Sequence, residues 1–220
     1  MIKSLVAGSM LAAAVASVAS AGFTGYSVQR TITTGGNIQY QVFANWDQSG
    51  LVFLNAFNFA TQSGTMNARH QDFFTSDGEV GTWQAGSSVS AADRGEDSWV
   101  TASGLATASG WGSALDPGFA NGGTVGDINN GAGWYDATPG TPNAIVAGGS
   151  QGGYRILLAQ IVRNSGDADA LATFYLKNSY KVAGTTTALF SEGTFSIGVV
   201  PAPGAMALLG VAGLAGRRRR

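Results

Sequence analysis

One short motif in this sequence has the spacing of a catalytic serine. Gly148, Ser150 and Gly152 match Gly-x-Ser-x-Gly, and a valine-containing stretch precedes them. A nucleophile elbow of this kind needs a helix after the serine and a histidine later in the chain as general base. The only histidine, His70, comes 80 residues before Ser150, and the residues after the motif have the pattern of a strand. We therefore interpret the motif as a glycine-rich turn and His70 as a surface or strand-edge residue.

Oxygen-bearing side chains in one segment have part of the spacing of a calcium loop. Asp127 and Asn129 alternate and Gly131 follows, and calcium prefers carboxylate and carbonyl oxygens. An EF-hand loop also needs Asp or Asn at its fifth position and Glu at its twelfth. Gly131 and Thr138 occupy those positions, so the match fails. Other acidic groups that could ligate are Asp93, Glu96 and Asp97, and Asp167 and Asp169. We expect no cofactor and interpret these groups as solvated turns, with a structural calcium as the alternative.

A pair of carboxylates for glycoside hydrolysis is the remaining catalytic possibility. Such a pair must lie within roughly 5–10 Å in space, which the order of residues along the chain does not establish. The glutamates are Glu79, Glu96 and Glu192, and none lies in a recognisable motif. We predict that the protein has no enzymatic activity, assign no catalytic or metal-binding residue, and keep a hydrolase as an alternative.

The composition is typical of a turn-rich β protein in an extracellular setting. Only 11% of the residues are charged, and 33 of the 220 are glycine, about twice the ordinary share. There is no cysteine, which excludes disulfides, thiolate metal sites and a lipoprotein anchor. Between positions 22 and 198, seven basic residues against thirteen acidic ones give a net charge of about −6. No basic patch occurs there, so we expect no nucleic-acid partner.

Alternating apolar residues predict strands in the first part of this central region. Ile38 to Trp46 alternates, with Ile38, Tyr40, Val42, Ala44 and Trp46 on one face. Tyr26 to Thr33 precedes it, and Gly35 to Asn37 between the two stretches predicts a hairpin. After a turn at Asp47 to Gly50, Leu51 to Phe59 is apolar on both faces. One face holds Val52, Leu54 and Ala56, and the other holds Leu51, Phe53, Phe57 and Phe59. We therefore expect this third strand to be central in its sheet.

The middle of the chain has a weaker pattern. Phe73-Phe74, Val80 to Gln84 and Ser98 to Ser103 are candidate short strands. Ala106 to Ser150 is rich in Gly, Asn, Pro and Asp and is long for a simple connection, which is typical of functional or mobile loops. Its aromatic residues are Trp111, Phe119, Trp134 and Tyr135. These rings either pin the loop to the body of the protein or present a binding surface.

Strands return in the last part of the central region. Tyr154 to Arg163 is compatible with a helix, but two apolar faces favour a strand buried on both sides: Ile156, Leu158 and Val162, and Leu157, Ala159 and Ile161. After a turn at Asn164 to Asp167, further strands are predicted at Leu171 to Leu176, Ala188 to Phe190 and Gly193 to Val200. About nine short strands without a convincing helix predict an all-β fold, an antiparallel β-sandwich or jelly roll over residues 22–198.

The last 22 residues, 199–220, have three successive parts. Pro201, Pro203 and Gly204 form a hinge that ends the preceding strand. Ala205 to Gly216 is uncharged and predicts a hydrophobic helix, and Arg217, Arg218, Arg219 and Arg220 follow it. Arginines cross a bilayer at high cost and remain on the cytoplasmic side. Pro203 to Gly216 is about 21 Å long as a helix, short for a bilayer core of about 30 Å. Transient insertion therefore fits this segment better than permanent residence.

This order of hinge, helix and arginine cluster resembles a PEP-CTERM sorting signal. The resemblance covers Val199 to Arg220 and implies processing near Pro201-Ala202-Pro203 by an exosortase-type enzyme, with release or surface attachment, often beside extracellular polysaccharide. The commonest form of the motif has Glu where this chain has Ala202. An ordinary C-terminal membrane anchor is the alternative interpretation. Several short elements also resemble uncharacterised PEP-CTERM proteins, but that similarity implies no activity. They are 97–101, 115–117, 133–135, 158–160 and 192–195.

Residues 1–21 have the composition of a secretory signal peptide. A basic start ending at Lys3 is followed by an apolar helix, Leu5 to Val18, and then by Ala19-Ser20-Ala21, which matches the Ala-x-Ala cleavage motif. No twin arginine is present, so we expect Sec export and cleavage by signal peptidase after Ala21.

The two terminal signals lead to a functional expectation. We expect an exported cell-surface or extracellular-matrix protein, tethered to the membrane through its C-terminal helix before processing. The first alternative is a carbohydrate-binding module that uses aromatic residues such as Trp111, Trp134 and Tyr135. An aromatic platform open to solvent would favour that alternative, whereas buried rings would count against it.

Overall fold

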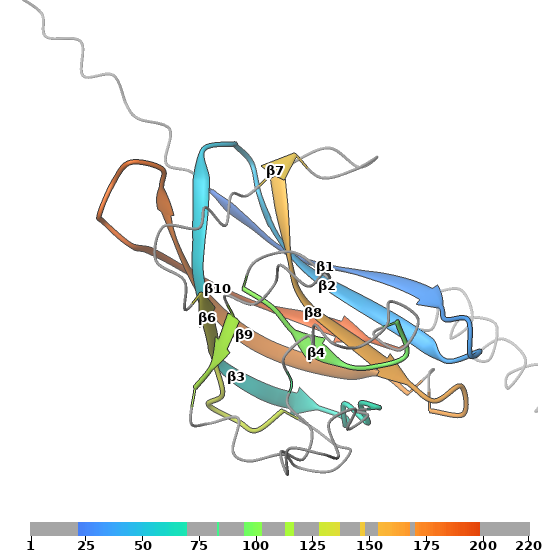
Figure 1. Ribbon diagram of the computed structural model, residues 1–220. Coiled ribbons are helices and arrows are strands. Elements are labelled where there is room, and N and C mark those ends of the chain that lie inside the picture. Colours follow the sequence, from blue (N-terminus) through green and yellow to red (C-terminus); the bar gives the residue numbers. More distant parts are fainter. Residues whose placement is uncertain are drawn as a thin grey trace, which may run out of the picture.

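A computed structural model of the chain describes residues 22–69, 83, 95–102, 113–116, 128–136, 146–147, 154–167 and 170–198 (Figure 1). The predicted signal and sorting segments, and therefore both predicted terminal helices, lie outside these residues. So do the predicted strand at Phe73-Phe74 and, apart from Trp83, the one at Val80 to Gln84.

The described chain forms ten strands in two antiparallel sheets, which confirms the predicted all-β class. The strands are β1 (Phe23–Ile32), β2 (Ile38–Trp46), β3 (Leu51–Ser63), β4 (Trp99–Val100), β5 (Ser113–Leu115), β6 (Trp134–Asp136), β7 (Val146–Ala147), β8 (Tyr154–Arg163), β9 (Ala172–Val182) and β10 (Leu189–Ile197). The bounds of β2 and β8 match those predicted from the apolar pattern. Each of these two strands has enough alternating positions to define its ends.

The first sheet has the order β1-β2-β8-β4, and β7 also pairs with β8. β1 and β2 form the predicted hairpin, in which Ile32 pairs with Ile38. Gly36 in its turn has a φ of 82°, which a residue with a Cβ atom adopts only at a cost. β8 lies inside the sheet and is buried from Ile156 to Arg163, as its apolar sequence predicts.

The second sheet has the order β10-β9-β3-β6-β5. The prediction that β3 is central is confirmed, because β3 pairs with β9 on one side and β6 on the other. The turn at 47–50 takes the chain from the first sheet into the second, and the segment at 164–171 does the same between β8 and β9.

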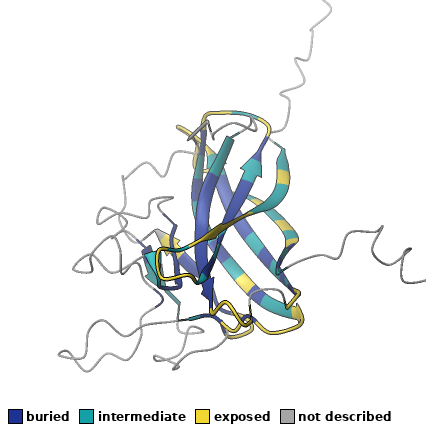
Figure 2. Cartoon of the chain, turned by 90° about the vertical axis from the view of Figure 1, so that its right-hand side faces the viewer, coloured by how far each residue is buried: buried dark blue, intermediate teal, exposed yellow. Residues whose placement is uncertain are grey.

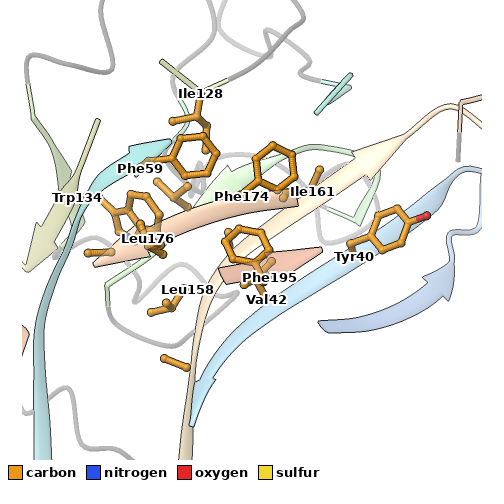
Figure 3. Close-up of a cluster of buried hydrophobic side chains, with 14 of the residues drawn as sticks. Tyr40, Val42, Phe59, Ile128, Trp134, Leu158, Ile161, Phe174, Leu176 and Phe195 are labelled. Carbon is orange, nitrogen blue, oxygen red and sulfur yellow. The ribbon is translucent and has the colours of Figure 1, made fainter. Parts of the chain in front are cut away.

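A single large apolar cluster draws side chains from both sheets. Figure 3 shows Tyr40 and Val42 from β2 with Phe174 from β9 and Phe195 from β10. Trp134 of β6 joins this cluster, and its indole nitrogen donates a 3.0 Å hydrogen bond to the carbonyl of Thr101. Buried and more exposed residues alternate along the long strands (Figure 2). The inward-facing residues are used for core packing, so the outward-facing residues, including those of the second sheet, are the ones available to contact a ligand.

Bulges change the facing of side chains in β3 and β8. The β3–β9 register shifts between Phe53 and Asn55 and again between Phe57 and Ala60. Ala56 is consequently buried with Leu51 and Phe53 in the core, which corrects its predicted place on the opposite face. A bulge extends over one extra residue and reverses the alternation beyond it.

The corresponding shift between β2 and β8 occurs at Val42 and Phe43. Ala159 and Ile161 therefore join Ile156 and Leu158 in the large cluster, whereas the prediction placed them on opposite faces. Leu157 packs instead with Phe43 and Trp99 in a second, small cluster.

Several other expectations from the sequence are corrected by the structure. Residues 106–150, predicted as a long loop, contribute β5, β6 and β7 to the sheets. Strands of two or three residues contain too few positions to show an alternating pattern. β1 begins at Phe23 and β3 and β9 continue beyond their predicted ends, whereas β4 is only two residues long. The separate strands predicted at Ala188 to Phe190 and Gly193 to Val200 are one strand, β10.

Candidate functional site: the outer face of the second sheet

The outer face of the second sheet combines exposed aromatic rings with polar side chains. Along β9, Phe174, Leu176 and Tyr180 face the core. The intervening residues of β9 therefore point to the opposite face, because successive side chains of a strand alternate. They are Thr173, Tyr175, Lys177, Ser179 and Lys181. β10 follows the same rule, and Phe190, Glu192, Thr194 and Ser196 share this outer face.

One row of residues crosses four strands of this face. Phe190 of β10 pairs with Ser179 of β9, Ser179 pairs with Asn55 of β3, and Asn55 pairs with Tyr135 of β6. The two ends of the row are open to solvent, since Phe190 is 70% exposed and Tyr135 is 44% exposed. The row thus places an exposed ring at each end and two small polar side chains in its centre.

A third ring, Phe57, adds apolar surface next to this row, since it pairs with Lys177 two residues along β9. Phe57 of β3 and Phe190 of β10 lie on either side of β9, and their ring centroids are 6.3 Å apart in an edge-to-face arrangement. The rings therefore lean toward each other across β9, where Ser179 is only 3% exposed. The hydroxyl of Ser179 donates a 2.6 Å hydrogen bond to Oδ1 of Asn55, which orients the amide of Asn55.

Charged side chains next to this row neutralise each other. Nζ of Lys177 lies 3.1 Å from Oε2 of Glu192, and the hydroxyl of Tyr175 donates a 2.7 Å hydrogen bond to the same oxygen. The hydrogen bond from Tyr175, followed by the one from Lys177, lowers the pKa of Glu192. The hydrogen bonds with Glu192 raise the pKa of Tyr175 and of Lys177. At neutral pH the cluster holds one positive and one negative charge.

We call six residues of this surface, three of them exposed and three half-buried, the outer-face patch. It consists of Asn55, Phe57, Tyr135, Lys177, Phe190 and Glu192. The patch offers apolar ring surface beside hydrogen-bonding groups. Binding a ligand that has both characters is the chemistry that this arrangement supports best.

The aromatic residues proposed from the sequence have different positions in the structure. Tyr135 is exposed and belongs to the patch, whereas Trp134, its neighbour in β6, is 2% exposed and packs in the core. For Trp134 the structure thus confirms the interpretation that the ring pins its segment to the body of the protein, and it excludes this ring from a binding surface. Trp111 and Phe119 lie outside the described residues.

The candidate catalytic groups are not brought together in the described part of the chain. Ser150 and His70 lie outside it. The carboxylate of Glu96 accepts hydrogen bonds from Thr33, Gly35 and Asn37 in the β1–β2 turn. The carboxylate of Glu192 belongs instead to the outer-face patch. These two glutamates thus have separate structural partners, and Glu79 lies outside the described ranges.

The segments proposed for calcium are partly accounted for by structural contacts. Within the segment from Asp127 to Gly131, Oδ1 of Asn130 accepts a 2.9 Å hydrogen bond from the backbone amide of Thr61, and Ile128 is buried in the core. Oδ1 of Asp97 accepts a 2.8 Å bond from the amide of Ser98. Asp93, Asp127 and Asp169 fall outside the described residues. Among the residues that the structure does describe, no group of three or more His, Cys, Asp or Glu side chains could hold a metal ion.

Five patch residues were not predicted as binding residues from the sequence: Asn55, Phe57, Lys177, Phe190 and Glu192, the last of which was considered only as a catalytic carboxylate. The alternation of Tyr175 and Lys177 with apolar neighbours in β9 was an available signal for an exposed face. The distance along the chain hides the rest of the site, because β3, β6, β9 and β10 meet only through sheet pairing.

Within the described ranges, no helix has the length and apolar character needed to cross a membrane. Comparison with known proteins finds no matching family model, no matching curated protein and no matching solved structure. The fold and the site therefore define a general class, an all-β protein of two antiparallel sheets with an exposed aromatic and polar face.

Proposed function

We propose that this chain is an exported cell-surface or extracellular-matrix protein without enzymatic activity. The main observation in support of this proposal is that the folded region lies between the two predicted terminal signals. β1 begins at Phe23, two residues after the predicted cleavage at Ala21, and β10 ends at Ile197, before the Pro201 hinge. All ten strands would therefore remain intact after removal of residues 1–21 and of the tail beyond the hinge.

We further propose that the folded domain at 22–198 is a β-sandwich of the jelly-roll type. Two antiparallel sheets that contribute to one shared apolar cluster support this architecture. Connections that pass between the sheets at 47–50 and 164–171 are the kind that a sandwich requires. The exported domain would thus carry its function on its outer faces and its loops.

The proposed route uses Sec export, signal peptidase and an exosortase-type enzyme. The C-terminal helix would tether the protein to the membrane until cleavage near Pro201 and Pro203, after which the domain reaches the surface or the medium. The resemblance of residues 199–220 to PEP-CTERM signals is the support for this route.

The test is the intact mass of the protein from each cell fraction of its native host. We expect a mass that lacks Met1 to Ala21 and the residues beyond about Pro203. Ala21→Phe should block signal-peptide removal because signal peptidase requires a small residue there, whereas Ser20→Leu at the tolerant middle position should not. A membrane-bound protein that retains Arg217 to Arg220 would instead identify a plain anchor.

One observation favours a second candidate function, the binding of carbohydrate. The outer-face patch exposes Phe190 and Tyr135 beside hydrogen-bonding groups. A solvent-exposed aromatic platform is the feature that distinguishes a carbohydrate-binding module from an inert matrix domain. The hydrolase alternative has no comparable support among the described residues.

A further inference from the structure

We propose that the outer-face patch binds an extended chain of a neutral polysaccharide across strands β10, β9, β3 and β6. This inference rests on the second candidate function and gives it a site and a ligand class. It does not depend on the route of export, because every group involved belongs to the folded domain.

The two exposed rings lie far enough apart to contact more than one sugar unit. Phe190 and Tyr135 are three inter-strand steps apart in the same cross-strand row, which corresponds to roughly 14 Å at about 4.8 Å per step. Phe57 lies between them and forms a ring pair with Phe190. Pyranose rings present apolar C–H faces that pack on aromatic rings. A chain that runs across the strands (Figure 1) would therefore stack at both ends of the row.

The polar groups beside the rings suit the hydroxyls of a sugar. Asn55, held by its 2.6 Å bond from Ser179, presents its amide group to this face with a fixed orientation. Lys177 and Glu192 supply a donor and an acceptor next to Phe57 and Phe190. Few, well-placed polar groups among ring surfaces are typical of small-ligand and carbohydrate recognition.

Charge selects neutral over anionic polysaccharides. Lys177 is paired with Glu192 at 3.1 Å, so the six patch residues are together neutral, and Lys181 of β9 adds one positive charge on the same face. The central region of the chain has a net charge of about −6 and repels polyanions over longer distances.

The same surface is poorly suited to a protein partner or to a second copy of the chain. The cores of protein interfaces are apolar and depleted of charged residues. In this patch the lysine–glutamate pair and the Asn55 amide interrupt the rings, so no continuous apolar centre exists for a protein to cover.

The binding experiment uses the full chain expressed in its host and purified from whichever fraction contains it. Native gels containing β-glucan, galactomannan or dextran test neutral polysaccharides, and gels containing alginate test an anionic one. We expect at least one neutral polysaccharide to retard the protein and alginate to leave its mobility unchanged. Phe190→Ala and Tyr135→Ala should each weaken the retardation roughly tenfold, the effect of losing a well-packed aromatic contact.

Ile32→Ala is the matched control, because Ile32 is 69% exposed but lies on β1 of the other sheet. Phe190→Trp should retain binding, and cooperative thermal unfolding of each variant verifies its fold. The proposal is overturned if no neutral polysaccharide retards the protein, if the alanine variants bind as the parent does, or if alginate binds best. It is also overturned if Phe190→Ala instead converts a dimer to a monomer in light scattering. Each result leaves the intact-mass test of export unaffected.

Discussion

The side-chain amide of Asn178 on β9 donates a 2.9 Å hydrogen bond to the hydroxyl of Tyr26 on β1, and this bond connects the two sheets. The Tyr26 hydroxyl in turn donates a 3.0 Å bond to the carbonyl of Leu176. Asn178 is fully buried, and among the residues that the structure describes its Oδ1 atom has no hydrogen-bond partner. The polar contacts of this buried amide therefore depend on Tyr26.

Tyr26→Phe should lower the free energy of unfolding by about 1–3 kcal/mol. The substitution removes both hydrogen bonds and leaves the amide of Asn178 buried without its partner. Urea unfolding at neutral pH measures the change. Tyr175→Phe is the control, because the Tyr175 hydroxyl lies on the outer face and its loss should have little effect. Equal effects of the two substitutions would contradict a special role for Tyr26.

Stability should also fall above about pH 10 because of Tyr26. Burial raises the pKa of Tyr26 above its ordinary value of 10.0, against the opposing hydrogen bond from Asn178. A raised pKa means that the unfolded chain releases this proton first, so the stabilisation is present below pH 10 and is lost as the pH rises. Urea unfolding at about pH 9 and pH 11 should show a smaller decline for Tyr26→Phe than for the parent. Parallel declines would contradict the prediction.

Glu96 should stabilise the β1–β2 turn above its pKa. Desolvation favours the protonated form, but hydrogen bonds from Asn37, Gly35 and Thr33 and the charge of Arg69 outweigh it and lower the pKa of Glu96. A lowered pKa gives stability that is present above the ordinary value of 4.5 and is lost as the pH falls. Glu96→Gln should therefore destabilise the protein at pH 7. It should also reduce the loss in the free energy of unfolding that accompanies a fall in pH.

Glu192→Gln provides the comparison for Glu96, because Glu192 is exposed and its ion pair with Lys177 is screened by solvent. We expect its effect at pH 7 to be clearly smaller. Chemical denaturation between about pH 3 and pH 7 distinguishes the two glutamates. If Glu96→Gln lost as much stability at acid pH as the parent does, the turn contacts of Glu96 would not contribute to stability.

Arg163→Met should lower the free energy of unfolding by at least about 3 kcal/mol. Arg163 is fully buried at the end of β8, and Nε donates a 2.6 Å bond to the carbonyl of Met66. Its terminal nitrogens donate to the carbonyls of Thr65, Asp167 and Ala170, so one guanidinium joins two connections of the fold. Removing it leaves several carbonyl groups without this donor.

Arg155→Met is the matched control on the same strand. The Arg155 guanidinium lies 4.2 Å from the centroid of the Phe43 ring, and loss of such a contact costs about 1 kcal/mol. Arg163→Lys should fall between the parent and Arg163→Met, since an ammonium group cannot reach all of the carbonyls. Thermal unfolding and soluble yield measure the series. Similar losses in the two methionine variants would contradict the role of Arg163.

Gly64→Ala should destabilise the protein more than Gly184→Ala. Both glycines have positive φ angles, 71° and 82°, so both substitutions carry a backbone cost of about 1–2 kcal/mol. A Cβ atom at Gly64 would also lie 2.5 Å from the carbonyl oxygen of Leu171, whereas none lies within 4 Å at Gly184. The difference between the two melting temperatures therefore measures the close contact between the residues after β3 and those before β9. Equal decreases in melting temperature would show that the backbone around Gly64 and Leu171 moves apart to accommodate the added Cβ atom at no cost.

The sequence alone determined the strands that have many alternating positions, and it determined the all-β class. β2 and β8 were predicted to the residue, and the hairpin at Gly36 followed from its turn residues, because both signals are local. The terminal signals are also local patterns, and they remain predictions about residues 1–21 and 199–220.

Only the tertiary structure decided which residues share a surface. The bulge after Phe53 moves Ala56 into the core, and pairing across four strands places Phe190 and Tyr135 in one row although 55 positions separate them in the chain. Gly193 is another example, because this residue of β10 lies beside the ring of Tyr26 from β1 of the other sheet, 167 positions earlier in the chain. Register, bulges and contacts between sheets depend on partners distant in sequence, so no local pattern specifies them.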